Sequence, residues 1–161
     1  MELCIDIEAN GLLYESDRIW MVCAVDDDGG WHVYLDQPIS ASLLPKPCSL
    51  YNKDQFIDLM YNADTVIAHN LYGYDLPLMM KLWDVDPNQI TGNDTAVMSS
   101  LFDPDIAGGH SLKAWGNRFG LYKGDHNEWD RFSPEMFTYC IRDVKVLDKL
   151  WRKLKHDMEL D

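Results

Sequence analysis

The chain lacks the features that mark secreted, membrane-spanning and zinc-binding proteins. Its 161 residues include only four cysteines, which are scattered and form no Cys-x-x-Cys pair, so we expect reduced core thiols, with neither disulfides nor a zinc site. No run of about 18 apolar residues is present, and Glu2 stands where a signal peptide has a basic segment. These absences predict a cytoplasmic protein with no membrane contact.

Basic residues are also scarce, because 14 Lys and Arg face 27 Asp and Glu and give a formal net charge of −13. Proteins that bind a long stretch of nucleic-acid backbone use many Lys and Arg contacts, so the composition argues against a broad DNA-binding surface. A site that contacts only a few phosphates remains compatible with it. The candidate basic contacts for such a site are Lys113, Arg118, Lys123 and Arg131.

The length of the chain and the order of its periodic segments predict one α/β domain, residues 1–161, with a sheet covered by helices. Residues 3–8 alternate with period two, which places Cys4, Asp6 and Glu8 on one face of an opening strand. The β-rich runs 18–25 and 31–35 flank a turn and predict an antiparallel hairpin. A buried strand is expected at 65–68, helices at 54–61, 76–83, 111–119 and from Ser133 onward, and a loop at 37–52, while residues 96–102 show no assignable period.

Four carboxylates in these segments are the strongest functional signal. Asp6 and Glu8 point the same way from the opening strand, Asp75 precedes the helix at 76–83, and Asp143 stands on the last helix. Tyr139 lies one turn before Asp143, since helical residues four apart are separated by about 40° around the axis. Converging carboxylates suit hard divalent cations, and with an ordered tyrosine they suggest two-metal hydrolysis of a phosphodiester.

Each of these residues also has a structural interpretation. An isolated Asp-x-Glu pair is more often a solvent-facing pair on an edge strand, Asp75 could cap the helix that contains Pro77, and Tyr139 could be a packing residue. Asn70 could form a turn or contact the substrate backbone. Leu12 and Tyr74 could pack at a rim or insert against terminal bases, since single-strand channels use such side chains for stacking. The combination of motifs, and no single one, favours the metal site.

Three motifs resemble those of the DEDD exonucleases of the tyrosine subtype, in particular the proofreading domain of family A DNA polymerases of short-tailed phages. The family's first motif is matched here by Asp6-Ile7-Glu8-Ala9-Asn10-Gly11-Leu12-Leu13. Its second is matched by His69-Asn70-Leu71-Tyr72-Gly73-Tyr74-Asp75, and its third by Tyr139-Cys140-Ile141-Arg142-Asp143. Segments 94–95, 110–116 and 128–136 are also similar, so the resemblance covers nearly the whole chain. It implies an RNase H-like mixed sheet, with an antiparallel meander plus parallel strands, covered by helices.

The resemblance also implies a role for each acid. Asp6 would bridge two divalent cations, Mg²⁺ or Mn²⁺, while Glu8 and Asp143 would complete the site of the ion that activates water. Asp75 would support the second ion through water, and Tyr139 would orient the attacking water. The substrate-binding residues would be Ala9, Asn10, Leu12, Asn70 and Tyr74.

The resulting prediction is a 3′-to-5′ exonuclease that acts on single-stranded DNA or frayed 3′ ends of duplex DNA and releases nucleoside monophosphates. A separately encoded polymerase is a candidate partner, and the cytoplasm of a bacterial host is the expected location if the protein is phage-encoded. An exoribonuclease that trims short RNA stays open, because the same acids serve both sugars. A catalytically silent acidic subunit with the same fold is the other alternative, although such a protein should lack at least one acid.

Overall fold

A mixed sheet forms the centre of the computed structural model, which describes residues 1–121 and 126–160. Strand β1 (Glu2–Ala9) pairs antiparallel with β2 (Ile19–Asp26), and β2 pairs antiparallel with β3 (Trp31–Leu35), as the hairpin pattern predicted. On the other side of β1 lie the parallel strands β5 (Thr65–Ala68) and β6 (Gly92–Asp94), and β4 (Cys48–Tyr51) runs parallel to β3. Within the described residues the order is β4-β3-β2-β1-β5-β6, which confirms the predicted class of α/β fold with a mixed sheet.

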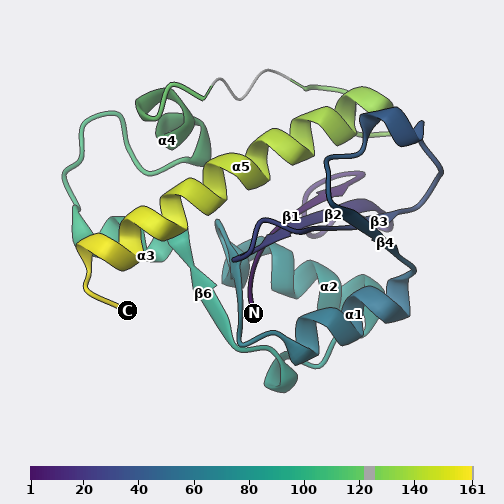
Figure 1. Cartoon of the computed structure of the whole chain (residues 1–161), viewed down its shortest axis with the longest axis horizontal. Helices are drawn as coiled ribbons and strands as arrows, with labels where there is room; N and C mark the ends of the chain where they lie inside the picture. The colour runs from purple at the N-terminus through teal and green to yellow at the C-terminus, as the bar shows by residue number, and fades with distance from the viewer. Residues whose placement is uncertain (122–125, 161) are drawn as a thin grey trace.

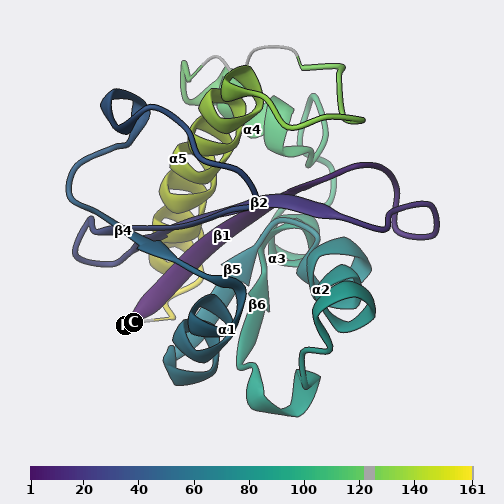
Figure 2. The ribbon, with the colours of Figure 1, turned by 90° about the vertical axis from the view of Figure 1, so that its right-hand side faces the viewer.

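Helices cover both faces of this sheet (Figures 1 and 2). The helices α1 (Lys53–Asn62) and α2 (Leu76–Trp83) lie on one face, and α5 (Pro134–Asp157) crosses the other face, where α3 (Thr95–Phe102) and α4 (Leu112–Arg118) pack against it. Short helical turns occupy Ala41–Leu43, Leu71–Asp75 and Pro87–Gln89. None of the helices in the described part of the chain has both the length and the apolar character of a membrane span.

The longest helix, α5, begins where the sequence predicted. The Ser133 hydroxyl accepts a hydrogen bond from the Met136 N–H at 3.2 Å, and Pro134 occupies the first turn, an arrangement that satisfies a free donor and costs no helical hydrogen bond. The apolar stripe predicted from residue spacings of three and four is buried against the sheet. It consists of Met136, Phe137, Cys140, Val144, Leu147, Trp151 and Leu154.

The period-two pattern of β1 divides the interior into two cores. Leu3, Ile5 and Ile7 pack on the side of α1 and α2, whereas Cys4 belongs to the cluster beneath α5. Because alternate residues of a strand share a face, Asp6 and Glu8 lie on the same side as Cys4. The strand therefore directs both carboxylates toward α5.

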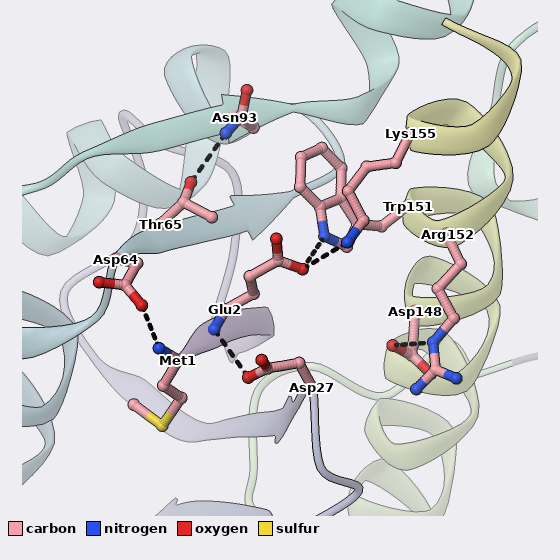
Figure 3. Close-up of polar contacts among 10 residues, drawn as sticks. All are labelled: Met1, Glu2, Asp27, Asp64, Thr65, Asn93, Asp148, Trp151, Arg152 and Lys155. Carbon is pink, nitrogen blue, oxygen red and sulfur yellow. Dashed lines mark hydrogen bonds and ion pairs between the residues drawn. The ribbon is translucent and has the colours of Figure 1, made fainter. Parts of the chain in front are cut away.

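Polar contacts fix α5 along β1. One carboxylate oxygen of Glu2, at the start of β1, accepts hydrogen bonds from Trp151 Nε1 at 2.9 Å and from Lys155 Nζ at 2.8 Å (Figure 3). Asp143 stands eight residues before Trp151, which is about two helical turns. The contacts of Trp151 and Lys155 with Glu2 therefore hold Asp143 over the middle of β1, near Asp6.

The predicted loop at 37–52 was wrong in its last part, because Cys48–Tyr51 forms the edge strand β4. The run is short, follows Pro47, and has two exposed residues, Ser49 and Leu50, between two half-buried ones, so its burial gives no period-two signal. It is held through main-chain pairing with β3, which a propensity argument does not register.

Two elements near residue 94 were also not assigned from the sequence. The strand β6 consists of Gly92, Asn93 and Asp94, residue types that are depleted in strands, and it is joined to β5 by a 2.8 Å hydrogen bond from Asn93 Nδ2 to Thr65 Oγ1 (Figure 3). Residues 95–102 form α3, whose outward face carries the exposed apolar residues Val97 and Leu101. An apolar outer face removes the polar contrast that identifies a helix from its sequence.

Candidate active site

The four predicted acids converge between β1, the turn before α2, and α5. Glu8, Asp75 and Asp143 are buried, and Asp6 is half-buried. Burial raises the pKa of Glu8 well above its ordinary value, and repulsion from Asp6 and then Asp143 raises it further. Burial likewise raises the pKa of Asp75, with Asp6 as the next cause. Repulsion between charges weakens with distance, so a charge that shifts a neighbour's pKa must lie near it. Asp6 is therefore near Glu8 and Asp75, and Asp143 is near Glu8.

Asp75 owes its position to a wide π-helical turn, Leu71–Asp75. Asn70 begins the turn in the left-handed region at φ 75°, and Asp94 holds it from the neighbouring strand by accepting the N–H groups of Asn70 at 2.9 Å and Tyr72 at 3.2 Å. Asp75 itself has helical backbone angles and, within the described residues, its carboxylate does not cap α2. The capping interpretation of Asp75 is therefore wrong, and the turn directs this buried side chain toward Asp6.

Tyr139 lies one turn before Asp143 on α5 and is half-buried against the segment that leads into the helix. Its ring meets the Trp129 ring edge to face, with centroids 5.7 Å apart and planes at 77°, and lies 5.9 Å from the His126 ring. These contacts confirm that Tyr139 is a packing residue. The same contacts hold its ring in place one turn before Asp143, and its predicted role toward water stays a prediction.

Cys140 also reaches the site, which the sequence reasoning missed. Its thiol lies 3.5 Å from the Oδ2 atom of Asp6, and one ligand atom each of Asp6, Glu8 and Cys140 lie within 4.8 Å of one another. The apolar spacing on α5 placed Cys140 in the core stripe, which is correct, because the side chain is fully buried. The position of Cys140 between Tyr139 and Asp143 on the same helix could have indicated that it reaches the site.

The carboxylates suit a hard divalent cation. Oxygen donors are the ligands that Mg²⁺ and Mn²⁺ prefer. A cation would offset the charge of Asp6, which, after burial, raises the pKa values of Glu8 and Asp75. Glu8 and Asp75 also fit a cation because each is an acid enclosed by protein, where an uncompensated charge is costly.

A cavity of about 690 Å³ opens next to Glu8. Four of the five predicted substrate-binding residues line it, and Asn70 does not. Among its described lining residues every charged side chain is acidic, which agrees with the scarcity of basic residues in the sequence. The lining consists of Ile7, Glu8, Ala9, Asn10, Gly11, Leu12, Glu15, Tyr74, Asn127, Glu128, Trp129 and Asp130.

The loop between β1 and β2 forms one wall of this cavity, and the Asn10 side chain organises it. Asn10 Oδ1 accepts hydrogen bonds from Ser16 Oγ and the Asp17 N–H, both at 3.1 Å, and from the Arg18 N–H at 3.2 Å, while its amide nitrogen donates to the Asp17 carboxylate. The side chain that was predicted to bind substrate therefore folds the loop.

Two residues of the Leu71–Trp83 segment tether the same loop. The Tyr74 hydroxyl donates to the Gly11 carbonyl at 3.0 Å, and burial together with the charge of Asp75 raises the pKa of Tyr74 to about 12. Lys81 Nζ donates to the Leu13 and Ser16 carbonyls at 3.0 and 2.7 Å. The loop is thus held while Leu12 projects from it, 71% exposed.

The predicted basic contacts occupy different situations. Arg118 donates to the carbonyls of Ala107 and Gly109 and stacks over the Trp115 ring, 4.5 Å from its centroid, so its guanidinium serves the loop before α4. Arg131 pairs with the cavity residue Glu128 at 2.7 Å. Lys113 is exposed on α4, and Lys123 lies outside the described residues.

Comparison with curated proteins finds phage DNA polymerases, while no family model matches the chain. The chain is 27% identical to the DNA-directed DNA polymerase of Enterobacteria phage T3 over 96% of its length, and 28% identical to that of Escherichia phage T7 over 94%. It resembles the phage DNA polymerases. The resemblance predicted from the motifs is thereby confirmed. The matches cover 27% and 26% of the two polymerases, so the chain spans about a quarter of the length of these relatives.

Comparison with solved structures shows the shared fold. Brucella melitensis NrnC with bound Mg²⁺ aligns with a TM-score of 0.70 at 22% identity, over 99% of this chain and 74% of NrnC. The family B DNA polymerase of Pyrobaculum calidifontis aligns with a TM-score of 0.67 at 16% identity, over 95% of this chain and 24% of the polymerase. Both neighbours support the predicted RNase H-like fold, the mixed sheet covered by helices.

Proposed function

We propose that residues 1–161 form a single exonuclease domain that hydrolyses phosphodiester bonds from the 3′ end of single-stranded or frayed DNA and releases nucleoside monophosphates. The observation that carries this proposal is the convergence of Asp6, Glu8, Asp75 and Asp143 beside a cavity. The resemblance to two phage DNA polymerases supports a nucleic-acid substrate.

The four acids would hold two divalent cations, Mg²⁺ or Mn²⁺. Asp6 is the candidate for the shared ligand, because it interacts with both Glu8 and Asp75. Glu8 and Asp143 would complete one site, and Asp75 would support the other. When bound, a pair of such ions neutralises charge on the reacting phosphate and activates the attacking water. The Mg²⁺ bound to NrnC, a protein of the same fold, supports this choice of cation.

Tyr139 would orient the attacking water. It precedes Asp143 by one turn on the same face of α5, and its ring is braced by Trp129 and His126. A hydroxyl held in this way can hydrogen-bond a water molecule for in-line attack without an entropic cost at the moment of reaction. This role needs no change in the ionisation of the tyrosine.

The cavity would receive the last nucleotides of the strand. Leu12 projects into solvent from the tethered loop, and the Trp129 side chain forms another part of the wall. Apolar and aromatic side chains stack on bases irrespective of sequence, so these two residues are suited to separate and hold terminal bases. Ala9 and the main chain at Asn10 would line the path, and Tyr74 would act by holding the loop.

The acidic lining limits the number of phosphates that the site can hold. Every charged side chain among the described lining residues is acidic, and Arg131 is already paired with the lining residue Glu128, so binding would depend on the metal ions and stacking. We therefore propose that digestion is distributive, with the enzyme leaving after one or a few nucleotides unless a partner tethers it. Because the two curated relatives are DNA polymerases, a separately encoded polymerase is a partner to test.

One comparison favours a second candidate substrate. The same fold occurs in a Brucella melitensis NrnC structure bound to pGG, with a TM-score of 0.68, so short RNA is the alternative to DNA. The catalytically silent subunit is less well supported, because all four acids are present and three of them are buried together.

Product ladders would test the proposal. DNA and RNA single strands of equal sequence, labelled at the 5′ end, are incubated with Mg²⁺, Mn²⁺ or a chelator. We expect the DNA to shorten stepwise from its 3′ end with either metal and to remain intact with the chelator. Intact DNA under all three conditions would contradict the proposed function, and a ladder from RNA alone would favour the exoribonuclease.

A further inference from the structure

The thiol of Cys140 lies against the acid at the centre of the candidate site. Cys140 Sγ is 3.5 Å from Asp6 Oδ2 and 3.6 Å from the Asp6 carbonyl oxygen, and its single S–H hydrogen is shared between these two acceptors. The residue is fully buried. The helix α5 thus contributes Cys140, in contact with Asp6, and Asp143 about one turn further on.

We propose that Cys140 is a positioning residue, which orients the Asp6 carboxylate for metal binding. This inference rests on the proposed function. Asp6 shares a hydrogen bond with Glu8 and lies within range of the charge of Asp75, so the direction of its carboxylate depends on the partners on each side of it. The Cys140 thiol at Oδ2 is one of these partners, and it restricts rotation of the carboxylate and so sets the direction in which Asp6 faces a cation. A thiol is a weak donor, but the bond lies in the interior, where polar interactions are strengthened.

The packing around Cys140 explains why a cysteine suits this place. Asp6 is paired across the sheet with Cys23 of β2, and Cys23 and Cys140 both belong to the core cluster beneath α5. A free thiol packs as a small apolar group while keeping one donor. Longer polar side chains would need space that a fully buried position does not offer.

The position of Cys140 relative to Asp6 is fixed from both ends of α5. The Ser133 cap holds the start of the helix, and the contacts of Trp151 and Lys155 with Glu2 hold its second half on β1. The 3.5 Å contact is therefore set by the crossing of α5 over the strand, and a change at position 140 should leave that crossing in place.

Mn²⁺ binding tests the proposal without relying on turnover. Partners that orient metal ligands typically contribute 10- to 100-fold to metal affinity, and for a weak thiol donor we expect Cys140→Ala to raise the Kd for Mn²⁺ by about 10-fold. Cleavage should recover at saturating Mn²⁺. Cys140→Ser keeps a donor and should have a Kd between those of Cys140→Ala and the unaltered protein, and Cys48→Ala, which removes the half-buried thiol of β4, should leave the Kd unchanged.

Calorimetric titration with Mn²⁺ gives each Kd, and circular dichroism verifies folding at the titration temperature. If Cys140→Ala is unfolded there, Cys140→Val fills the space without a donor and takes its place. A donor-free variant with an unaltered Kd, or a serine variant that binds no better than the alanine variant, would overturn the inference. Asp6→Ala, assayed in parallel, distinguishes failure of the proposed function from failure of this inference. Normal cleavage by Asp6→Ala would refute the proposed function. An inactive Asp6→Ala, together with an unaltered Mn²⁺ Kd in Cys140→Ala, would refute only the role of Cys140.

Discussion

Replacing Asp6 by asparagine should stabilise the metal-free protein while it abolishes cleavage. Ligand atoms of Asp6 and Glu8 lie within 4.8 Å of each other, and two full charges at that distance repel by about 3–4 kcal/mol at an effective dielectric constant of about 20. The raised pKa of Glu8 relieves part of this energy, because Glu8 keeps its proton to higher pH. We therefore expect Asp6→Asn to raise the free energy of unfolding by about 1–3 kcal/mol, which for a domain of this size is roughly 5 °C in Tm.

The same repulsion gives the metal-free protein a characteristic pH dependence. An acid whose pKa is higher in the folded than in the unfolded state contributes stability below its unfolded pKa, about 4.3 for Glu, and loses it as the pH rises through the folded pKa. Glu8 and Asp75 are both shifted upward, so in the presence of a chelator the protein should be less stable when measured at about pH 8 than at about pH 5. The fall should be smaller in Asp6→Asn but should not vanish, since burial is the largest cause of the Glu8 shift.

Thermal denaturation with chelator, at both pH values and for both proteins, measures these effects, and added Mg²⁺ should stabilise the unaltered protein more than the variant. An Asp6→Asn protein that is less stable than the original, or that keeps the full pH dependence, would refute the electrostatic reasoning. Asp36→Asn, at an acid outside the site that pairs with Arg18, is the matched control and should leave the pH dependence unchanged.

Other variants probe the remaining parts of the site. Asp143→Ala should abolish cleavage and weaken Mg²⁺ affinity in a calorimetric titration, whereas Asp75→Ala should retain residual activity because its contact with the cation is proposed to be indirect. Tyr139→Phe should lower the single-turnover rate by about 10²-fold with little change in the Mg²⁺ requirement, and an unchanged rate would leave Tyr139 only its packing role. Trp129→Ala should raise the KM for single-stranded DNA by about 10-fold through the loss of base stacking, and an unaltered KM would remove Trp129 from the substrate path. The logarithm of DNA affinity should fall with the logarithm of salt concentration at a slope equivalent to roughly two to four phosphate contacts, each near −0.7; a much steeper slope would reveal a basic channel.

The main elements of the fold could be predicted because their patterns depend on local periodicity. Strand β1 alternates, and α5 has a capped start and a regular apolar stripe, so the orientations of Asp6, Glu8 and Asp143 followed from the period of each element. Strands β4 and β6 could not be predicted, because their stability comes from pairing with β3 and β5 and not from their own composition.

The acids of the candidate site could be predicted from the sequence, but the residues that contact and position the site could not. The convergence of Asp6 and Asp143 follows from the faces of two elements, but the contact of Cys140 with Asp6 depends on where α5 crosses the sheet, which no local pattern encodes. The same holds for Asn10, whose hydrogen bonds to residues 16–18 exist only after the loop has closed. Side chains that act through tertiary geometry have no signature within their own segment.

The most direct test of the central claim is the release of the terminal nucleotide. Single-stranded DNA labelled at its 3′-terminal nucleotide is mixed with an excess of the unaltered protein or of Asp6→Ala, and the label is followed in time after Mg²⁺ is added. The account predicts that the unaltered protein releases the label first and as a nucleoside monophosphate, and that Asp6→Ala, although folded, releases none. Release of the label within longer fragments, or equal release by both proteins, would contradict it.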